Sequence, residues 1–181
     1  MVYNLCSVVL GVLLMFASTS DAIPTGELTM ICKKTQNPKL CVNLLKSNPK
    51  NASLVEVTEH IIDVVGEEVR KGIKLIHDLI GGERNPVARR HYWSCLEHFG
   101  SEGALGDVEY SKEMLRRRDY LGVNVAASAV ISDVEDCVSG DSPTDPSFHD
   151  SSALPKCAAH VESIVDVLLV LSNRLANKII S

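Results

Sequence analysis

One stretch of this sequence carries three side chains that could bind a metal ion. His91, Cys95 and His98 stand at positions i, i+4 and i+7 of HYWSCLEH, which places them on one face of a helix. Imidazole and thiolate groups are the ligands that zinc prefers. We expect Cys95 to form a disulfide instead, because other features of the chain indicate export to an oxidising compartment. No metal site and no cofactor is therefore predicted.

A second group of side chains offers carboxylates and a hydroxyl. Asp133, Glu135 and Asp136 resemble the paired acids that catalyse glycoside hydrolysis. On the flank of a helix, a solvated acidic surface is the simpler interpretation. Ser128 lacks the Gly-x-Ser-x-Gly turn of a hydrolase nucleophile and lies among alanines, which favours a contact between helices. We therefore predict no catalytic residue and no enzymatic activity.

The beginning of the chain indicates export. Residues 8–16 form an apolar run too short to span a bilayer, and Ser20-Asp21-Ala22 fits a signal-peptidase site. We interpret residues 1–22 as a secretory signal peptide and expect a mature domain over residues 23–181, secreted and without a membrane segment. Asn51-Ala52-Ser53 is a glycosylation sequon in a polar turn, usable only in a secreted chain.

An odd number of cysteines follows the signal: Cys32, Cys41, Cys95, Cys137 and Cys157. Spacing alone leaves their connectivity open. A hairpin broken at Pro38 and the adjacency of antiparallel helices favour sequential pairing, Cys32 with Cys41 and Cys95 with Cys137. Cys157 then remains unpaired, and we expect it to be buried near the start of the last helix.

Apolar periodicity predicts an all-α fold. Residues 23–50 form a stapled helical hairpin, and residues 53–181 form an up-and-down four-helix bundle. The stripe of the first bundle helix ends at Gly81-Gly82, interpreted as a C-cap. The second begins at Pro86 and continues through Leu115, with Gly100, Gly103 and Gly106 predicting a kink, an irregular turn or a close helix contact in its middle.

The third bundle helix covers residues 119–137, with Asp119 as its N-cap. The fourth runs from Leu154 with heptad spacing in which Ser172 fills one apolar slot. The chain has a formal net charge of −5, which argues against nucleic acid as a partner and for a basic protein partner.

Four segments together resemble the plant invertase/pectin methylesterase inhibitors: ICKKTQNPKLC, CLEHF, DYLGVNVAASAV and IVDVLLVLSNRL. The resemblance covers essentially the whole mature chain. It implies a secreted four-helix bundle with an N-terminal hairpin and two sequential disulfides. It also implies an inhibitor that covers the active-site cleft of a carbohydrate enzyme of the cell wall or vacuole.

Within that family, invertase inhibitors often carry Pro-Lys-Phe where this chain has Asp119-Tyr120-Leu121. The Asp-Tyr start, Asn124 and the Ala-Ser-Ala step at 127–129 look more like the pectin methylesterase inhibitors. We therefore expect a 1:1 complex with pectin methylesterase in the apoplast or cell wall. Acid invertase is the alternative target, and a helical binding module without an enzyme target is a third reading.

The resemblance also indicates which residues meet the enzyme. It places the contact face on the helices that bear Cys95 and Cys137. The implied partner-binding residues are Glu97, Asp119, Asn124 and Ser128. We predict that Glu97→Lys or Asn124→Ala weakens inhibition and leaves thermal stability nearly unchanged.

Overall fold

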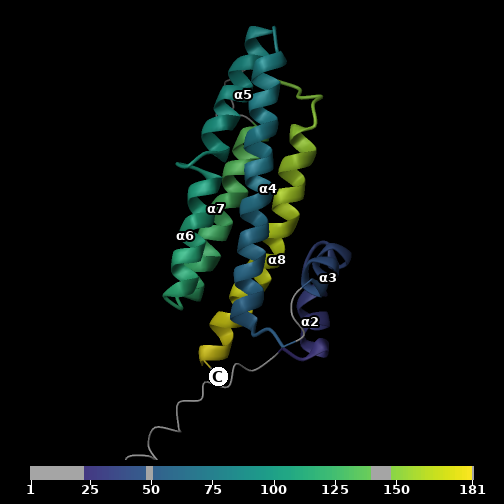
Figure 1. The fold of residues 1–181 in the computed structure, drawn as a ribbon, viewed down its shortest axis with the longest axis vertical. Helices are drawn as coiled ribbons and strands as arrows, with labels where there is room; N and C mark the ends of the chain where they lie inside the picture. Colours follow the sequence, from purple (N-terminus) through teal and green to yellow (C-terminus); the bar gives the residue numbers. More distant parts are fainter. Residues whose placement is uncertain (1–22, 48–50, 140–147, 181) are drawn as a thin grey trace, which may run out of the picture.

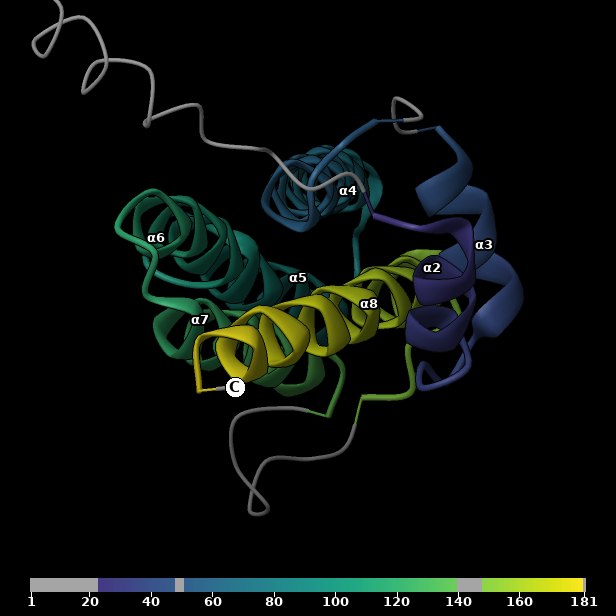
Figure 2. The ribbon, with the colours of Figure 1, turned by 90° about the horizontal axis from the view of Figure 1, so that it is seen from below.

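The computed structural model of this protein describes residues 23–47, 51–139 and 148–180 (Figure 1). The expected signal peptide therefore lies outside the described residues, as do residues 140–147 before the last helix. The secondary-structure elements of the described residues are all α-helices, which confirms the predicted all-α class. The long helices lie side by side along one axis, and the N-terminal hairpin packs against one end of the bundle (Figures 1 and 2).

The hairpin consists of α2 (Thr25–Cys32) and α3 (Pro38–Lys46). Asn37 caps α3 by accepting a hydrogen bond from the Leu40 N–H at 3.1 Å, and Pro38 stands at the first helical position, where its missing N–H costs nothing. The hairpin packs against α8 (Leu154–Ile180), where the Gln36 N–H donates to the Asp166 carboxylate at 2.7 Å. Figure 2 shows the hairpin beside α8 on the outside of the bundle.

The first bundle helix is α4 (Leu54–Gly82). Ser53 and Glu56 form a capping box, in which each side chain accepts the other residue's N–H. The predicted apolar stripe of α4 is buried as expected. Gly81 and Gly82 do not form the left-handed cap that was predicted. They stay inside the helix, and Glu83 ends it in an extended conformation.

The predicted helix over residues 86–115 is two helices, α5 (Pro86–Phe99) and α6 (Ala104–Arg116). The glycines therefore mark an irregular turn between two helices, which is one of the predicted outcomes. At Gly103 a Cβ atom would collide with the carbonyl oxygen of His98, so the chain can turn here only without a side chain. The two pieces together occupy one position in the bundle (Figure 1), and the four-helix arrangement is preserved.

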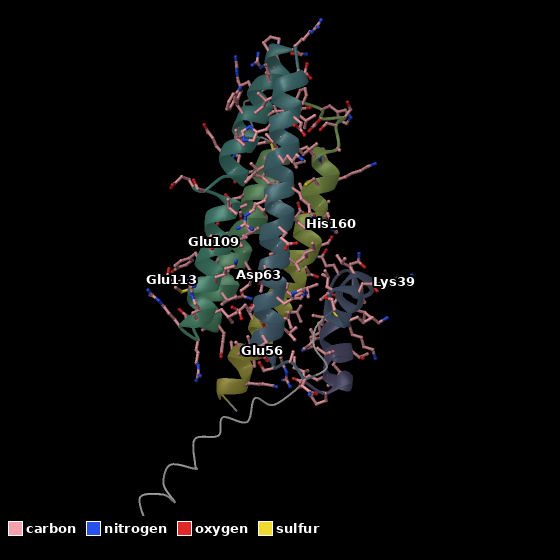
Figure 3. The ribbon with its side chains drawn as sticks, viewed as in Figure 1. Lys39, Glu56, Asp63, Glu109, Glu113 and His160 are labelled. Atoms are coloured by element: carbon pink, nitrogen blue, oxygen red, sulfur yellow. A yellow bond between two sulfur atoms is a disulfide. The ribbon has the colours of Figure 1, made fainter. Side chains whose placement is uncertain are left out.

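The third bundle helix is α7 (Tyr120–Ser139), and Asp119 caps it as predicted: its Oδ1 accepts the Gly122 N–H at 2.8 Å. The predicted heptad positions of α8 from Leu154 to Leu175 are buried, Ser172 included. Ion pairs on the outside join α4 to α6, because Arg70 contacts Glu109 at 3.1 Å and Lys112 contacts Asp63 at 2.8 Å. Figure 3 labels Asp63 on α4 and Glu109 on α6.

Candidate functional site: the outer face of α7 and its anchors

Two disulfides hold the scaffold, and both have the predicted pairing. Cys32 is bonded to Cys41 within the hairpin, and Cys95 of α5 is bonded to Cys137 of α7. Cys157 is unpaired and only half-buried, so the expected full burial is wrong. Partial burial raises the pKa of its thiol. The second disulfide fixes the far end of α7 against α5.

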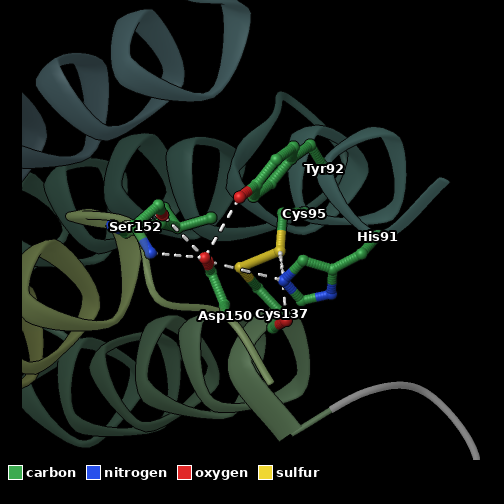
Figure 4. Close-up of a disulfide and its surroundings, with 7 residues drawn as sticks. His91, Tyr92, Cys95, Cys137, Asp150 and Ser152 are labelled. Carbon is green, nitrogen blue, oxygen red and sulfur yellow. Dashed lines mark hydrogen bonds and ion pairs between the residues drawn. A yellow bond between two sulfur atoms is a disulfide. The ribbon is translucent and has the colours of Figure 1, made fainter. Parts of the chain in front are cut away.

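A buried carboxylate beside this disulfide anchors the start of α8 (Figure 4). Asp150 accepts the Tyr92 hydroxyl at 3.1 Å and the Ser152 N–H at 2.8 Å. His91 lies 3.8 Å from the same carboxylate, whose side chain is only 4% exposed. Burial raises the pKa of Tyr92, which keeps its hydroxyl a donor. Asp150 was not identified from sequence, because it lies in a polar loop with no periodic pattern.

The spacing of His91, Cys95 and His98 does not produce a metal-binding set. The Cys95 sulfur is bonded to Cys137 in the disulfide and is not available as a metal ligand. Within the described ranges, no group of three or more His, Cys, Asp or Glu side chains could hold a metal ion. His91 instead stacks on Phe148, with ring centroids 4.8 Å apart. These residues brace the scaffold.

The predicted acidic surface on α7 is only partly solvated. Glu135 and Asp136 are exposed. Asp133, however, is half-buried and faces Asp107 of α6. Burial and the neighbouring Asp107 carboxyl raise the pKa of Asp133 to about 6. The two carboxyl groups therefore belong to the contact between α6 and α7.

The outer face of α7 carries two exposed apolar residues, Leu121 (64% exposed) and Val125 (67% exposed). Ser128 lies on the same face, because positions i, i+4 and i+7 of a helix align. Ser128 is exposed and donates its hydroxyl to the Asn124 carbonyl of its own helix at 3.0 Å. The prediction that Ser128 contacts another helix is therefore wrong. Asp119 is also exposed, at the start of this face.

Asn124 points from α7 to α8 and not directly away from the bundle. Its side-chain amide donates to the Ser172 hydroxyl at 2.9 Å and to the Leu169 carbonyl at 3.3 Å. The residue is half-buried. This geometry argues against the expectation that Asn124→Ala leaves stability unchanged, because the substitution removes a polar link between two bundle helices.

Glu97 is exposed on α5, and the exposed Trp93 (51%) lies one turn before it on the same face. Glu97 follows Cys95 by two residues, so it lies near the Cys137 end of α7. A helix rises 1.5 Å per residue, which puts Asp119 roughly 24 Å away along the bundle. The predicted residues are thus spread along most of the length of α7 and onto its disulfide partner helix.

Sequence reasoning missed Leu121, Val125 and Trp93. The signal that could have found them is an apolar residue out of phase with its helix's core stripe. On α7 that stripe contains Val123, Val130 and Val134, and all three are buried. An exposed tryptophan or leucine off such a stripe marks a possible contact surface.

A groove lies elsewhere, between the hairpin and the last helix. It has a volume of about 360 Å³ and lies between α2 and α8, with Met30 and Val170 among its apolar walls. Glu27 in this groove is already paired with Arg174 at 2.9 Å and with Lys178 at 3.2 Å. The partner-binding residues expected from sequence do not line it, and it is separate from the α7 face.

Comparison with known proteins decides the family. The family model for plant invertase/pectin methylesterase inhibitors matches residues 27–171. The chain belongs to this family. Its members are inhibitors and not enzymes, as the resemblance implied.

Curated relatives in the family are pectinesterase inhibitors. Pectinesterase inhibitor 1 of Arabidopsis thaliana is 26% identical, over 90% of this chain and 89% of the relative. The pectinesterase inhibitor of Actinidia deliciosa is 27% identical, over 97% of this chain and 98% of the relative. Pectinesterase inhibitor 2 of Arabidopsis thaliana is 26% identical, over 93% and 95%. Among family members, the chain is thus similar to pectin methylesterase inhibitors.

Solved structures of the family have the same fold. A crystal structure of mutant form A of a pectin methylesterase inhibitor from Arabidopsis superposes with a TM-score of 0.68 at 26% identity, covering 81% of this chain and 95% of that one. A second crystal structure, of a pectin methylesterase inhibitor from Arabidopsis thaliana, superposes with a TM-score of 0.60 at 25% identity, covering 84% of this chain and 98% of that one. Within the described part of the chain, no helix combines the length and apolar character needed to cross a membrane.

Proposed function

We propose that this protein is a secreted inhibitor of pectin methylesterase that covers the enzyme's active-site cleft in a 1:1 complex. The observation that carries the proposal is the set of curated relatives, which are pectinesterase inhibitors matched over nearly the full length of both chains. The protein supplies no chemistry of its own in this proposal. It acts by occupying the surface that substrate would need.

The outer face of α7 is the proposed contact surface. Leu121 and Val125 provide exposed apolar anchors, and Asp119, Ser128 and Glu97 provide a polar surround, as in protein interfaces generally. A standard interface buries roughly 800 Å² on each partner, a patch about 30 Å across. The roughly 24 Å strip from Asp119 to Glu97 fits within one such patch. Asn124 supports this surface by fixing α7 to α8.

Rigidity favours inhibition by this surface. The disulfide between Cys95 and Cys137 closes the end of α7, and the Asp119 cap orders its beginning. A surface that is already ordered loses little conformational entropy on binding, so more of the contact energy contributes to affinity. The acidic chain, with a net charge of −5, also favours a basic enzyme surface.

The proposed location is the apoplast or cell wall. Two disulfides are typical of oxidising compartments. Asn51 lies in an exposed turn, where its sequon is accessible to glycosylation. Together with the apolar run at residues 8–16, these features support secretion.

Parallel enzyme assays test the target. Residues 23–181 are added in increasing amounts to a pectin methylesterase and to an acid invertase. We expect loss of methylesterase activity alone, with an equimolar complex by light scattering. Loss of sucrose cleavage alone would assign the chain to the invertase inhibitors, and loss of neither activity would leave a helical binding module without an enzyme target.

Surface variants test the contact face. We expect Val125→Asp and Glu97→Lys to weaken inhibition about tenfold or more, as for a central interface residue. Val87→Asp, on a half-exposed valine at the start of α5, and Glu59→Lys, on an exposed glutamate of α4, are the matched controls. If the controls weaken inhibition as much as the two test variants, the α7 face is not the contact surface.

A further inference from the structure

The charges of this chain are divided unevenly between the hairpin and the rest of the sequence. Residues 23–47 contain four lysines and one glutamate, a formal charge of +3, in a chain whose net charge is −5. Lys33, Lys34, Lys39 and Lys46 are all exposed, and Figure 3 labels Lys39 on the hairpin. Among the residues that the structure describes, no ion pair involves these lysines. The hairpin is therefore a basic surface on an acidic protein.

Two cations of α8 extend this basic surface. Arg174 Nε lies 2.9 Å and Lys178 Nζ 3.2 Å from the Glu27 carboxylate, and the two cationic side chains remain 44% and 43% exposed. A single carboxylate neutralises only one of the two charges. Within the described part of the chain, Arg174 uses only its Nε atom in this contact, so its two terminal nitrogens remain open to a further carboxylate.

The groove between α2 and α8 lies within this surface. Its volume of about 360 Å³ is that of a small-ligand site. Lys34 and Arg174 line the groove together with the amide of Asn173, and Met30 and Val170 provide apolar walls. The cations suit carboxylates, and an amide that both donates and accepts hydrogen bonds suits hydroxyl groups. The lining therefore fits an acidic sugar, which carries both groups on an otherwise apolar ring.

We propose that the hairpin and α8 bind a polyuronate chain, the carboxylate-bearing product of pectin methyl-ester hydrolysis. This choice of occupant rests on the proposed function. Hydrolysis takes up water, releases methanol and a proton, and leaves a carboxylate on the sugar, so a neutral substrate becomes a polyanion. A carboxylate that recurs along a chain suits lysines that are spread over a surface. Lys39 and Lys46, for example, lie roughly 10 Å apart along α3.

A protein partner fits this surface less well. Protein interfaces have an apolar centre inside a polar rim, whereas Met30 is the one large apolar residue that is exposed in the described part of the hairpin. The hairpin and α7 lie on different sides of α8 (Figure 2). The polymer and the enzyme can therefore be bound at the same time. Such binding would hold the inhibitor on pectin from which the enzyme has already removed methyl groups.

Calorimetric titration of the protein with polygalacturonate tests this site. We expect binding that weakens as salt is added, because salt screens the charges, and binding to fully methyl-esterified pectin of equal length that is about tenfold weaker or less. Lys34→Gln combined with Arg174→Gln should weaken polygalacturonate binding about tenfold. Lys39→Gln combined with Lys46→Gln should also weaken it, and this pair removes no ion pair from the described residues.

Lys74→Gln combined with Lys156→Gln is the matched control, because it removes two exposed lysines from α4 and from the start of α8. We expect this control to bind polygalacturonate as the parent does. The proposal is overturned if esterified pectin binds as tightly as polygalacturonate, if neither test pair weakens binding, or if the control weakens it equally. Equal affinity for poly-L-glutamate of matched charge would also overturn it, because the surface would then select acidic peptides as well.

The titration contains no enzyme, so its result is separate from the inhibition assays. A parent protein that binds polygalacturonate and inhibits no methylesterase would support the polyuronate site and overturn the proposed function alone. A parent that inhibits methylesterase and does not bind polygalacturonate would overturn the polyuronate site alone.

Discussion

Asn124 links the candidate site to the stability of the bundle, and its substitution by alanine tests that link. The Asn124 amide makes two hydrogen bonds to α8, one to the fully buried Ser172 and one to the Leu169 carbonyl. Alanine removes both bonds and leaves a small void between α7 and α8. We expect Asn124→Ala to be less stable than the parent.

The magnitude follows from these contacts. A neutral hydrogen bond contributes about 1 kcal/mol to the net free energy of unfolding. The Ser172 hydroxyl still donates to the Leu169 carbonyl at 3.0 Å, so that carbonyl keeps a partner after the substitution. The expected loss is therefore about 1–2 kcal/mol. For a chain of this size, that lowers the thermal midpoint by about 3–6 °C.

Circular dichroism at the helical band measures the midpoint. Ser128→Ala is the matched control, because Ser128 is exposed and bonds only within its own helix, and its midpoint should change by about 1 °C or less. A double-mutant cycle with Ser172→Ala should show about 0.5–1 kcal/mol of coupling between positions 124 and 172.

A midpoint equal to the parent's, with additive effects of Asn124→Ala and Ser172→Ala, would refute this reasoning. Asn124 would then contribute nothing to the α7–α8 contact. Inhibition is measured separately, at a temperature where the parent and Asn124→Ala are both folded. Weaker inhibition without any loss of stability would place Asn124 directly at the enzyme interface.

Two further predictions concern the frame that holds α7. A Cβ at Gly72 would lie 2.6 Å and 2.8 Å from ring atoms of the buried Phe99, so Gly72→Ala should cost about 1–3 kcal/mol in urea unfolding. A Cβ at Gly81 would have no atom within 4 Å, so Gly81→Ala should stabilise the fold by up to about 1 kcal/mol. Equal effects of Gly72→Ala and Gly81→Ala on stability would contradict the close packing at Gly72. Replacing both Cys95 and Cys137 by serine opens a loop with a sequence separation of 42 and should cost on the order of 4 kcal/mol. Cys157→Ser should cost far less in the same assay, and a similar cost would contradict the role assigned to the disulfide.

The helices and the disulfide pairing could be predicted because they depend on local pattern and on chain adjacency. Helical spacing identified the buried faces of α4 and α8, since a residue's side on a helix follows from its position in sequence. The Asp119 cap was predictable for the same reason. The position of the helix end near Gly82 was also predicted, although Gly81 and Gly82 lie within α4 and do not form the predicted cap.

The break between α5 and α6 could be predicted only as one of several alternatives, because local preference does not distinguish a kink from an irregular turn between two separate helices. Each glycine weakens a helix by about 1 kcal/mol wherever the chain then goes. The requirement for glycine at position 103 comes from the close approach of the His98 carbonyl. That approach exists only once the turn has formed.

The roles of polar residues on α7 could be predicted only in part. Asn124 and Ser128 are both short polar residues, one turn apart, yet the first is half-buried against α8 and the second is exposed. Asp133 and Glu135 differ in the same way, because only Asp133 faces α6. Whether the flank of a helix is buried depends on which neighbouring helix covers it. The periodicity of a sequence does not show where that neighbouring helix lies.

This division of α7 decides which substitutions can report on enzyme binding. Asp119 caps the helix, and its replacement by alanine should cost about 1 kcal/mol of stability whatever its role at an interface. Asn124 carries a similar structural role. Leu121 and Val125 have no such role, since each residue is more than 60% exposed. A loss of inhibition at Leu121 or Val125 would therefore report on the contact itself, whereas the same loss at Asp119 or Asn124 needs a stability measurement beside it.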